Sequence, residues 1–239
     1  MILNKNLPTV IKPQMPSDIH TRAIVLRRTN YGESDRILNL ITPEGKVAVL
    51  ARGVRKSKSR LAGGIELFSV ADVVIHQGRS TLGTLTSAKM LSFYSNLLAD
   101  VSKLELAGTL LKRLDRASEQ VPSPEHFTIL QQSLEALNDD YSNDLVFAWF
   151  ALNLARSNGE EINFLRDTSG AELSPDLSYN WDTVENALRP DSHGKVDAKA
   201  IKLARFLLSH PLRFASKIEH LSTVLPPIYE IAKIIHNQY

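Results

Sequence analysis

The residues best suited to bind a charged ligand lie in a short basic run. The segment 52–60 reads Arg-Gly-Val-Arg-Lys-Ser-Lys-Ser-Arg and carries five cationic side chains in nine positions. Charges at this density are not buried without partners, so they face solvent or a polyanion. Together with basic residues that precede the run, the candidate set is Arg27, Arg28, Arg36, Lys46, Arg52, Arg55, Lys56, Lys58 and Arg60.

Tyr31 adds an aromatic ring to this set, in a turn that contains Gly32. A cationic groove with a ring suits single-stranded nucleic acid, because phosphates supply affinity and the flat face of a base stacks on the ring. Two other interpretations stay open. The basic run is a solvated loop without a ligand, and Tyr31 packs against its own turn.

Catalytic patterns are missing from the sequence. Glu33 and Asp35 could hold Mg²⁺ or act as an acid–base pair, or they are turn residues that pair with nearby arginines. The segment 53–57 lacks the Gly that precedes the Lys of a nucleotide-binding phosphate loop. The seven histidines show no HExxH or HxH spacing, and there is no cysteine. We expect no enzyme activity, no metal and no cofactor.

The charge is divided unevenly along the chain. Residues 1–80 hold 13 Lys and Arg against 6 Asp and Glu, a net charge of +7, whereas residues 81–239 hold 15 against 20, a net charge of −5. This division predicts a basic module that faces a polyanion, joined to a mildly acidic module with another task.

The basic module has the pattern of short β-strands. Branched apolar segments at 21–28, 36–42, 46–54, 67–77 and 81–91 are bounded by turn residues. Closing five short strands into a barrel removes their exposed edges, so we predict a β-barrel domain over 19–94.

From about residue 96 the apolar period becomes helical. We predict helices at 97–119, from Ser123-Pro124 onward, at 143–157, at 197–209 and at 228–237. The segment 165–194 lacks a period and is expected to form a loop or small hairpin inserted in a helical domain over 95–239. The expected fold class is α+β.

Residues 1–18 contain three prolines and no period, so we expect a flexible N-terminal arm. No apolar run approaches the ~20 residues that span a bilayer, and this arm lacks the apolar core of a secretion signal. We therefore expect a soluble protein of the cytoplasm without a membrane partner.

Five motifs follow one another in the first 60 residues: Ala23-Ile-Val-Leu26, Tyr31-Gly-Glu-Ser-Asp35, Leu40-Ile-Thr42, Gly45-Lys46 and the run 51–60. In order and in spacing they resemble the opening module of the bacterial RecO family of DNA repair proteins. A looser likeness extends into the helical half, where Trp149-Phe150-Ala-Leu152-Asn-Leu154 is followed by Gly159 and is similar to a Phe-x-Leu helix of the family.

The resemblance implies a five-stranded oligonucleotide-binding (OB) barrel followed by a helical domain. It also implies a non-enzymatic mediator of recombination at the nucleoid, which binds single- and double-stranded DNA and anneals complementary strands. With RecR, and sometimes RecF, such a protein helps RecA to load onto strands coated by single-stranded-DNA-binding protein (SSB). Annealing needs no leaving group, because the protein neutralises phosphates and base pairing supplies the free energy.

The sequence departs from the family in one respect. Many members carry two CxxC pairs in the loop that corresponds to 165–194, and this chain has none, so the zinc site implied by the family is dropped. Packing and hydrogen bonds, through Tyr179 and Trp181, are expected to hold this region instead.

Two alternative functions stay open. One is an OB-fold RNA-binding factor or RNA-processing enzyme with an acidic metal site near Glu33 and Asp35. The apolar stripes of the helical half consist of Leu, Val, Phe and Ala. An enzyme would be expected to place titratable side chains there, so this pattern disfavours the RNA-processing enzyme. The other is a scaffold whose basic loop is incidental.

The resemblance further implies that the acidic half binds the SSB tail, which ends in acidic residues, an apolar tip and a free carboxylate. Such a tail requires an apolar notch beside cations. Helix 197–209 offers Lys199, Lys202, Arg205 and Phe206. An ordinary amphipathic helix with a solvated basic edge is the alternative.

Overall fold

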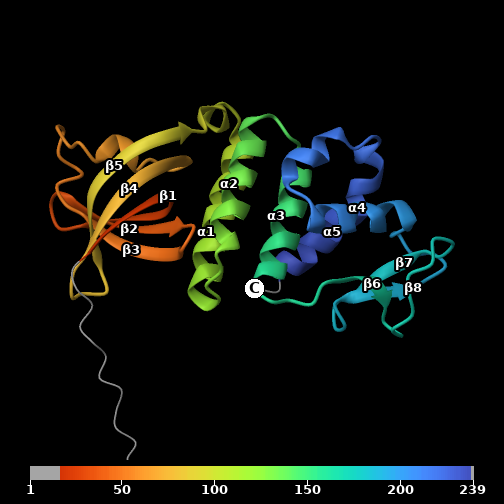
Figure 1. The fold of residues 1–239 in the computed structure, drawn as a ribbon. Helices are drawn as coiled ribbons and strands as arrows, with labels where there is room; N and C mark the ends of the chain where they lie inside the picture. The colour runs from red at the N-terminus through yellow and green to blue at the C-terminus, as the bar shows by residue number, and fades with distance from the viewer. Residues whose placement is uncertain (1–16, 238–239) are drawn as a thin grey trace, which may run out of the picture.

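The computed structural model describes residues 17–237, which form a barrel followed by a helical domain (Figure 1). The barrel strands are β1 (Ser17–Tyr31), β2 (Asp35–Thr42), β3 (Gly45–Ala51), β4 (Ser69–Gln77) and β5 (Gly83–Phe93). They close in the order β1-β2-β3-β5-β4, in which β3 and β5 are parallel and the other pairs antiparallel. This is the strand order of an OB fold, so the fold class expected from the sequence is confirmed.

Strand β1 is buried on both faces over Ala23–Leu26. Ala23 and Val25 point into the barrel core, whereas Ile24 and Leu26 join the core of the helical domain. This double burial explains why the segment is continuously apolar rather than alternating. The strand starts at Ser17, two residues before the expected start of the barrel, while residues 1–16 of the predicted arm lie outside the described residues.

The segment between β3 and β4 carries the basic run and then a short 3₁₀ helix, η1 (Ala62–Gly64). A Cβ at Gly64 would lie 2.5 Å from the backbone of Ala88 in β5, so only glycine allows this approach. The close contact seats η1 against β5 and fixes the end of the basic loop on the barrel.

Five α-helices follow the barrel: α1 (Val101–Gln120), α2 (Glu125–Asn138), α3 (Asn143–Ser157), α4 (Ala198–Ser209) and α5 (Leu221–Asn237). Helix α1 lies against the barrel, and α3 is the central helix, buried over most of its surface (Figure 1). Two further 3₁₀ helices are η2 (Ser95–Ala99) and η3 (Leu212–Lys217). None of the helices in the described part of the chain is long and apolar enough to cross a bilayer.

The start expected for the last helix is wrong, because Pro226 and Pro227 lie inside α5 rather than at its beginning. A proline has the φ angle of a helix, but inside a helix it loses one hydrogen bond and its ring crowds the carbonyl of residue i−4. The buried side chains of Leu225 and Ile228 face the helical core and hold this part of the helix in place.

The insertion contains regular structure that was not expected, a three-stranded sheet of β6 (Asn163–Asp167), β7 (Tyr179–Asp182) and β8 (Ala187–Pro190). Its order is β6-β8-β7, and it lies at the end of the molecule opposite the barrel (Figure 1). Strands β6 and β8 do not alternate apolar and polar residues, and the alternation of β7 covers only four, which is why the sequence indicated only a loop or hairpin.

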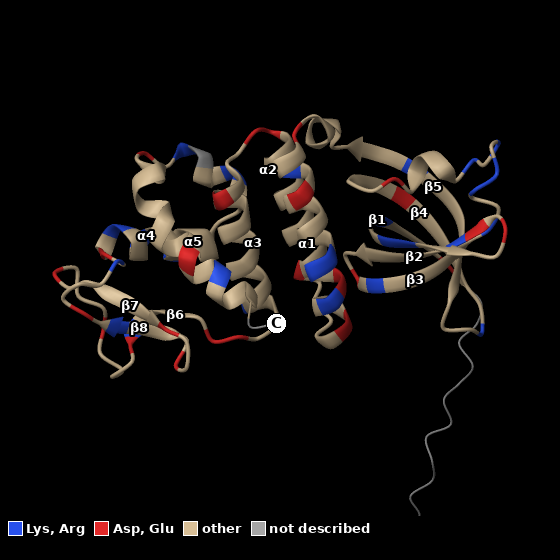
Figure 2. Cartoon of the chain, turned by 180° about the vertical axis from the view of Figure 1, so that it is seen from behind, with Lys and Arg blue, Asp and Glu red and all other residues tan. Residues whose placement is uncertain are grey.

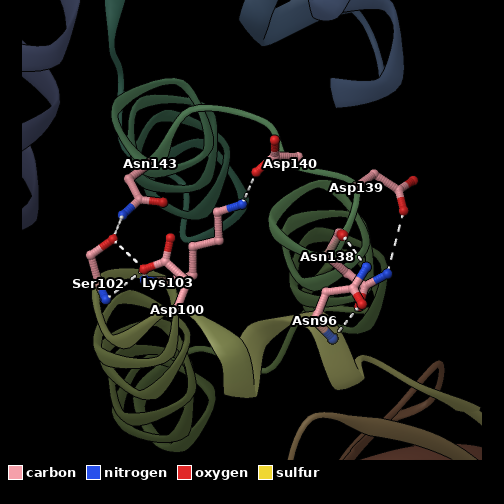
Figure 3. A network of polar contacts seen from close by, with 8 residues as sticks. All are labelled: Asn96, Asp100, Ser102, Lys103, Asn138, Asp139, Asp140 and Asn143. Carbon is pink, nitrogen blue, oxygen red and sulfur yellow. Dashed lines mark hydrogen bonds and ion pairs between the residues drawn. The ribbon is translucent and has the colours of Figure 1, made fainter.

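Polar side chains join the first three helices at one end (Figure 3). Asn96 in η2 donates its backbone N–H to Asn138 Oδ1 at 3.2 Å, and Lys103 of α1 pairs with Asp140. Asn143 Nδ2, at the start of α3, donates to Ser102 Oγ at 3.1 Å. These contacts tie α1, α2 and α3 together beside the barrel.

Candidate nucleic-acid interface

The basic loop is braced against the β1–β2 turn by three hydrogen bonds. The backbone N–H of Gly53 donates to Asp35 Oδ1 at 2.7 Å, and the N–H of Arg55 donates to Ser34 O at 2.9 Å. Arg55 Nη1 also donates to Gly32 O at 3.3 Å. Tyr31 and the basic run, which are separate in the sequence, therefore meet at one end of the barrel, where the loop projects away from the helices (Figure 2).

The cations of this loop are directed to solvent. All five basic residues of the run 52–60 are exposed. Among residues 17–237, no carboxylate forms an ion pair with any of them. Unpaired cations grouped on one loop create a positive potential that attracts a polyanion. These exposed residues are Arg52, Arg55, Lys56, Lys58 and Arg60.

Tyr31 is 56% exposed, an unusual degree for a tyrosine in a folded domain. More than half of the residue is accessible to a stacked base, and it lies at the end of β1 beside the braced loop. The geometry is compatible with stacking and leaves the ring little packing within its own turn.

Two further candidates lie near the loop but have protein partners. Arg28 Nη1 pairs with Glu66 Oε2 at 3.0 Å, and Arg36 Nε donates to Asn30 Oδ1 at 3.2 Å. Both residues are partly buried. They contribute charge to this end of the barrel with less freedom than the loop cations.

Lys46 and Arg27 lie elsewhere, at the contact between the barrel and α1. Lys46 Nζ is 2.5 Å from Asp115 Oδ1 and 2.8 Å from Glu119 Oε1, and its side chain is only 13% exposed. Arg27 Nε is 3.1 Å from Asp115 Oδ2. Helix α1 thus supplies carboxylates that the sequence could not place beside these cations, and we leave Lys46 out of the proposed DNA surface.

The acidic pair has a structural explanation. Asp35 Oδ1 accepts hydrogen bonds from Gly53 N and from Ser34 Oγ, whereas Glu33 is exposed. In the part of the chain that the structure describes, no group of three His, Cys, Asp or Glu side chains could hold a metal ion. The alternative of a metal site at this pair is not supported.

A second candidate surface lies on α4, where a pocket of about 570 Å³ opens beside Lys199 and Lys202. Its apolar wall comes from Leu203 and Phe206, completed by Ile218 and Val224. The last two belong to the chain before and within α5, so helix 197–209 alone could not reveal them.

Arg205 does not belong to this pocket. Its Nε donates to Phe164 O at 2.7 Å and holds β6 against α4. Residues 199, 202 and 205 advance around the helix, because a spacing of three residues falls short of a full 3.6-residue turn. The expectation that Arg205 shares one surface with the two lysines is therefore wrong.

Both halves of the chain match models of a single family. Residues 15–94 match the description "Recombination protein O N terminal", and residues 99–231 match "Recombination protein O C terminal". The chain belongs to the RecO family of DNA repair proteins. The family likeness expected from the barrel motifs is thereby confirmed, and it extends through the helical domain.

Individual RecO proteins are also similar to this chain in sequence. The DNA repair protein RecO of Roseiflexus sp. (strain RS-1) is 32% identical over 206 residues, which cover 83% of this chain and 72% of that protein. RecO of Dehalococcoides mccartyi (strain ATCC BAA-2266 / KCTC 15142 / 195) is 32% identical over 201 residues, 80% and 79% of the two chains. RecO of Alkaliphilus metalliredigens (strain QYMF) is 28% identical over 231 residues, 92% of each.

Proposed function

We propose that this RecO family member is a non-enzymatic mediator that binds single- and double-stranded DNA and anneals complementary strands. With RecR, and with RecF where that protein takes part, it helps RecA to load onto DNA coated by SSB. The observation that carries the proposal is the basic loop, whose five exposed cations are held beside Tyr31 on an OB barrel.

The physical mechanism follows from charge. Two DNA strands repel each other, and cations placed along the backbones release condensed counterions and lower that repulsion. Tyr31 offers a π face to any base, so its contribution does not depend on sequence. Base pairing then supplies the free energy, and no proton or leaving group needs to move. No observation favours the alternative of an RNA-processing enzyme.

The decisive test removes the loop charges. We expect Arg55→Ala with Lys56→Ala, Lys58→Ala and Arg60→Ala to weaken binding of all single-stranded oligonucleotides alike. Each lost phosphate contact should lower the slope of log affinity against log salt by about 0.7. Titration of a labelled oligonucleotide at several salt concentrations measures this slope. Lys195→Ala with Lys217→Ala removes charge far from the barrel and should leave it unchanged. Wild-type affinity and slope in the quadruple variant would exclude the loop from DNA binding.

For the partner, we propose that the α4 pocket receives the C-terminal tail of SSB. Lys199 and Lys202 would pair with the acidic residues and carboxylate of the tail, and Phe206 with Leu203 would contact its apolar tip. An apolar socket of about 570 Å³ next to two exposed lysines supports this assignment.

Charge reversal in the pocket tests this interaction. Lys199→Glu with Lys202→Glu should abolish binding of an SSB-tail peptide in fluorescence anisotropy, because the pocket would then repel the acidic residues. Annealing of bare DNA should continue. Arg79→Glu with Lys89→Glu, two exposed cations on the barrel, is the matched control. Unaltered peptide binding in the pocket variant would move the tail site elsewhere.

A further inference from the structure

A stripe of cations on α1 faces a polar groove that the proposed DNA loop and tail pocket do not use. Thr109, Lys112, Arg113 and Arg116 recur at the spacing of one helix face, and they line a cavity of about 320 Å³ with His236 and Asn237 at the end of α5. No Leu, Ile, Val or Phe side chain lines this cavity. Its charged groups are the cations of Lys112, Arg113 and Arg116, which can bind an anion.

Two cations of the stripe are directed to solvent. Lys112 and Arg116 are exposed, and of the residues that the structure describes, no carboxylate forms an ion pair with either. Like charges four residues apart destabilise a helix. The nearby acids of α1, Asp115 and Glu119, pair with Lys46 of the barrel, and Glu119, whose side chain is 60% exposed, lies one turn after Arg116 on the same helix face.

The neighbouring imidazole responds to the same positive field. Burial and, as a smaller effect, the charge of Arg113 together lower the pKa of His236 to about 4. His236 is therefore neutral at pH 7, and the groove keeps its charge in the arginine and lysine side chains.

The stripe continues toward the barrel. Asp115, the residue before Arg116, forms an ion pair with Arg27 of the barrel. The side chain of Arg27 is 58% exposed. Figure 2 shows basic positions on α1, the helix that lies beside the barrel. Exposed cations thus extend from the barrel strand β1 onto the helical domain.

We propose that Lys112 and Arg116 bind the phosphate backbone of a second DNA strand while the basic loop of the barrel holds the first. The inference rests on the proposed annealing function and adds a second site to it. Annealing brings two polyanions to one protein, and two separate cationic surfaces can hold both strands with less repulsion than one surface. A polar groove without an apolar socket favours a phosphate chain over an acidic peptide.

The test separates one-strand binding from two-strand annealing. Lys112→Glu with Arg116→Glu should bind a single oligonucleotide with the affinity and salt slope of wild type. It should anneal complementary strands at least roughly tenfold more slowly, because two phosphate contacts to the second strand are lost. The slope of log affinity against log salt for binding of the second strand should fall by about 1.4. Energy transfer between two non-complementary labelled oligonucleotides, present with wild type, should be lost.

Two further variants control for general effects. Lys195→Glu with Lys217→Glu makes the same change in net charge on exposed residues away from the stripe and should anneal like wild type. Lys112→Gln with Arg116→Gln removes the charges without reversal and should show the same defect in milder form, with helical circular dichroism and melting temperature unchanged.

The outcomes are distinct. Annealing by the charge-reversed stripe variant at the rate of its control would overturn the second site. An equal loss of single-strand binding and annealing would overturn it as well, because the stripe would then be part of the first site. Failure of wild-type protein to anneal would refute the proposed function itself, which the wild-type arm reports independently.

Discussion

Asp35 illustrates how a residue can support the proposed DNA surface without contacting DNA. Its carboxylate accepts the N–H of Gly53 at 2.7 Å and thereby fixes the start of the basic loop. Gly53 has φ +61°, a conformation that glycine adopts without strain. The same carboxylate is negative and lies near the cations, so its electrostatic effect on DNA and its structural effect on the loop have opposite signs.

This opposition gives a prediction. Asp35→Ala should weaken single-strand binding roughly fivefold, since losing a hydrogen bond to a charged acceptor destabilises the bound loop by about 1 kcal/mol or more. Glu33→Ala removes the same charge from an exposed position in the same turn and should keep or slightly strengthen binding. Anisotropy titrations of both variants decide the matter. Stronger binding by Asp35→Ala would mean that its charge matters and its hydrogen bond does not.

The sequence predicts the surroundings of a residue correctly where these are set by its neighbours in the chain. The loop cations are exposed and grouped because they are adjacent in sequence and cannot be buried. Lys46 and Arg205 were misplaced because their partners are remote: Asp115 lies 69 residues after Lys46, and Phe164 lies 41 residues before Arg205. Only the packing of α1 on the barrel, and of α4 on β6, brings these groups together.

Among the elements, the small sheet β6-β8-β7 shows how a cysteine-free chain orders its insertion. Asp167 Oδ1 accepts hydrogen bonds from Ser169 Oγ and from the N–H groups of Ser169 and Ala171. Asp182 Oδ1 accepts the N–H groups of Val184 and Glu185, and its other oxygen pairs with Arg189. Each aspartate holds one turn of the sheet.

Both carboxyl groups should make the stability of this sheet depend on pH. The Ser169 hydroxyl, ahead of backbone N–H groups, lowers the pKa of Asp167, and the N–H of Glu185, ahead of that of Val184, lowers the pKa of Asp182. A carboxyl with a lowered folded pKa stabilises the fold above its unfolded pKa, near 3.9, and loses that contribution as the pH falls toward the folded value.

We therefore expect Asp167→Ala with Asp182→Ala to be less stable than wild type at pH 7. The difference should shrink as the pH falls below about 4, where the carboxyls of the unfolded chain become protonated first and those of the folded protein at still lower pH. Urea unfolding at several pH values, followed by the fluorescence of Trp149 and Trp181, measures this difference. Asp176→Ala, at an exposed position of the same insertion, should not change the pH dependence. A constant difference across this range would show that protonation of the two groups does not matter.

The sequence predicted the positions of helices and strands wherever apolar residues recurred regularly over enough positions. Helix α3 has the limits expected from its apolar residues, and the barrel strands lie within a few residues of the branched segments. The small sheet was missed because its strands are short and its order comes from turns built by Asp167 and Asp182. Side-chain bonds to backbone N–H groups leave no apolar period in the sequence.

In the whole molecule, barrel and helices share one hydrophobic core. Ile24, Leu26 and Ile41 of the barrel pack in the same cluster as the buried residues of α1, α2 and α3. The outer face of β1 and β2 is therefore covered by the helical domain, whereas the loop end of the barrel, where we propose the DNA surface, stays uncovered. Asp115 lies at the polar edge of this contact and binds Lys46, Arg27 and Asn39.

Asp115→Ala should therefore affect the assembly of the two domains. Lys46, which is 13% exposed, would lose its nearest carboxylate, and we expect unfolding to become easier by about 2–3 kcal/mol. For a chain of 239 residues this corresponds to a melting temperature lower by about 5–10 °C. Glu119→Ala removes the more exposed partner of Lys46, 60% exposed, and should change stability by less than about 1 kcal/mol.

The same two variants distinguish a structural from a DNA-binding role for the barrel cations at this contact. If Lys46 serves the domain contact, Asp115→Ala lowers the melting temperature while single-strand affinity does not fall, because a negative charge has been removed and the loop is intact. Calorimetry and an oligonucleotide titration on one preparation give both values. An unchanged melting temperature with altered DNA affinity would return Lys46 and Arg27 to the DNA surface and would imply that α1 can move away from the barrel.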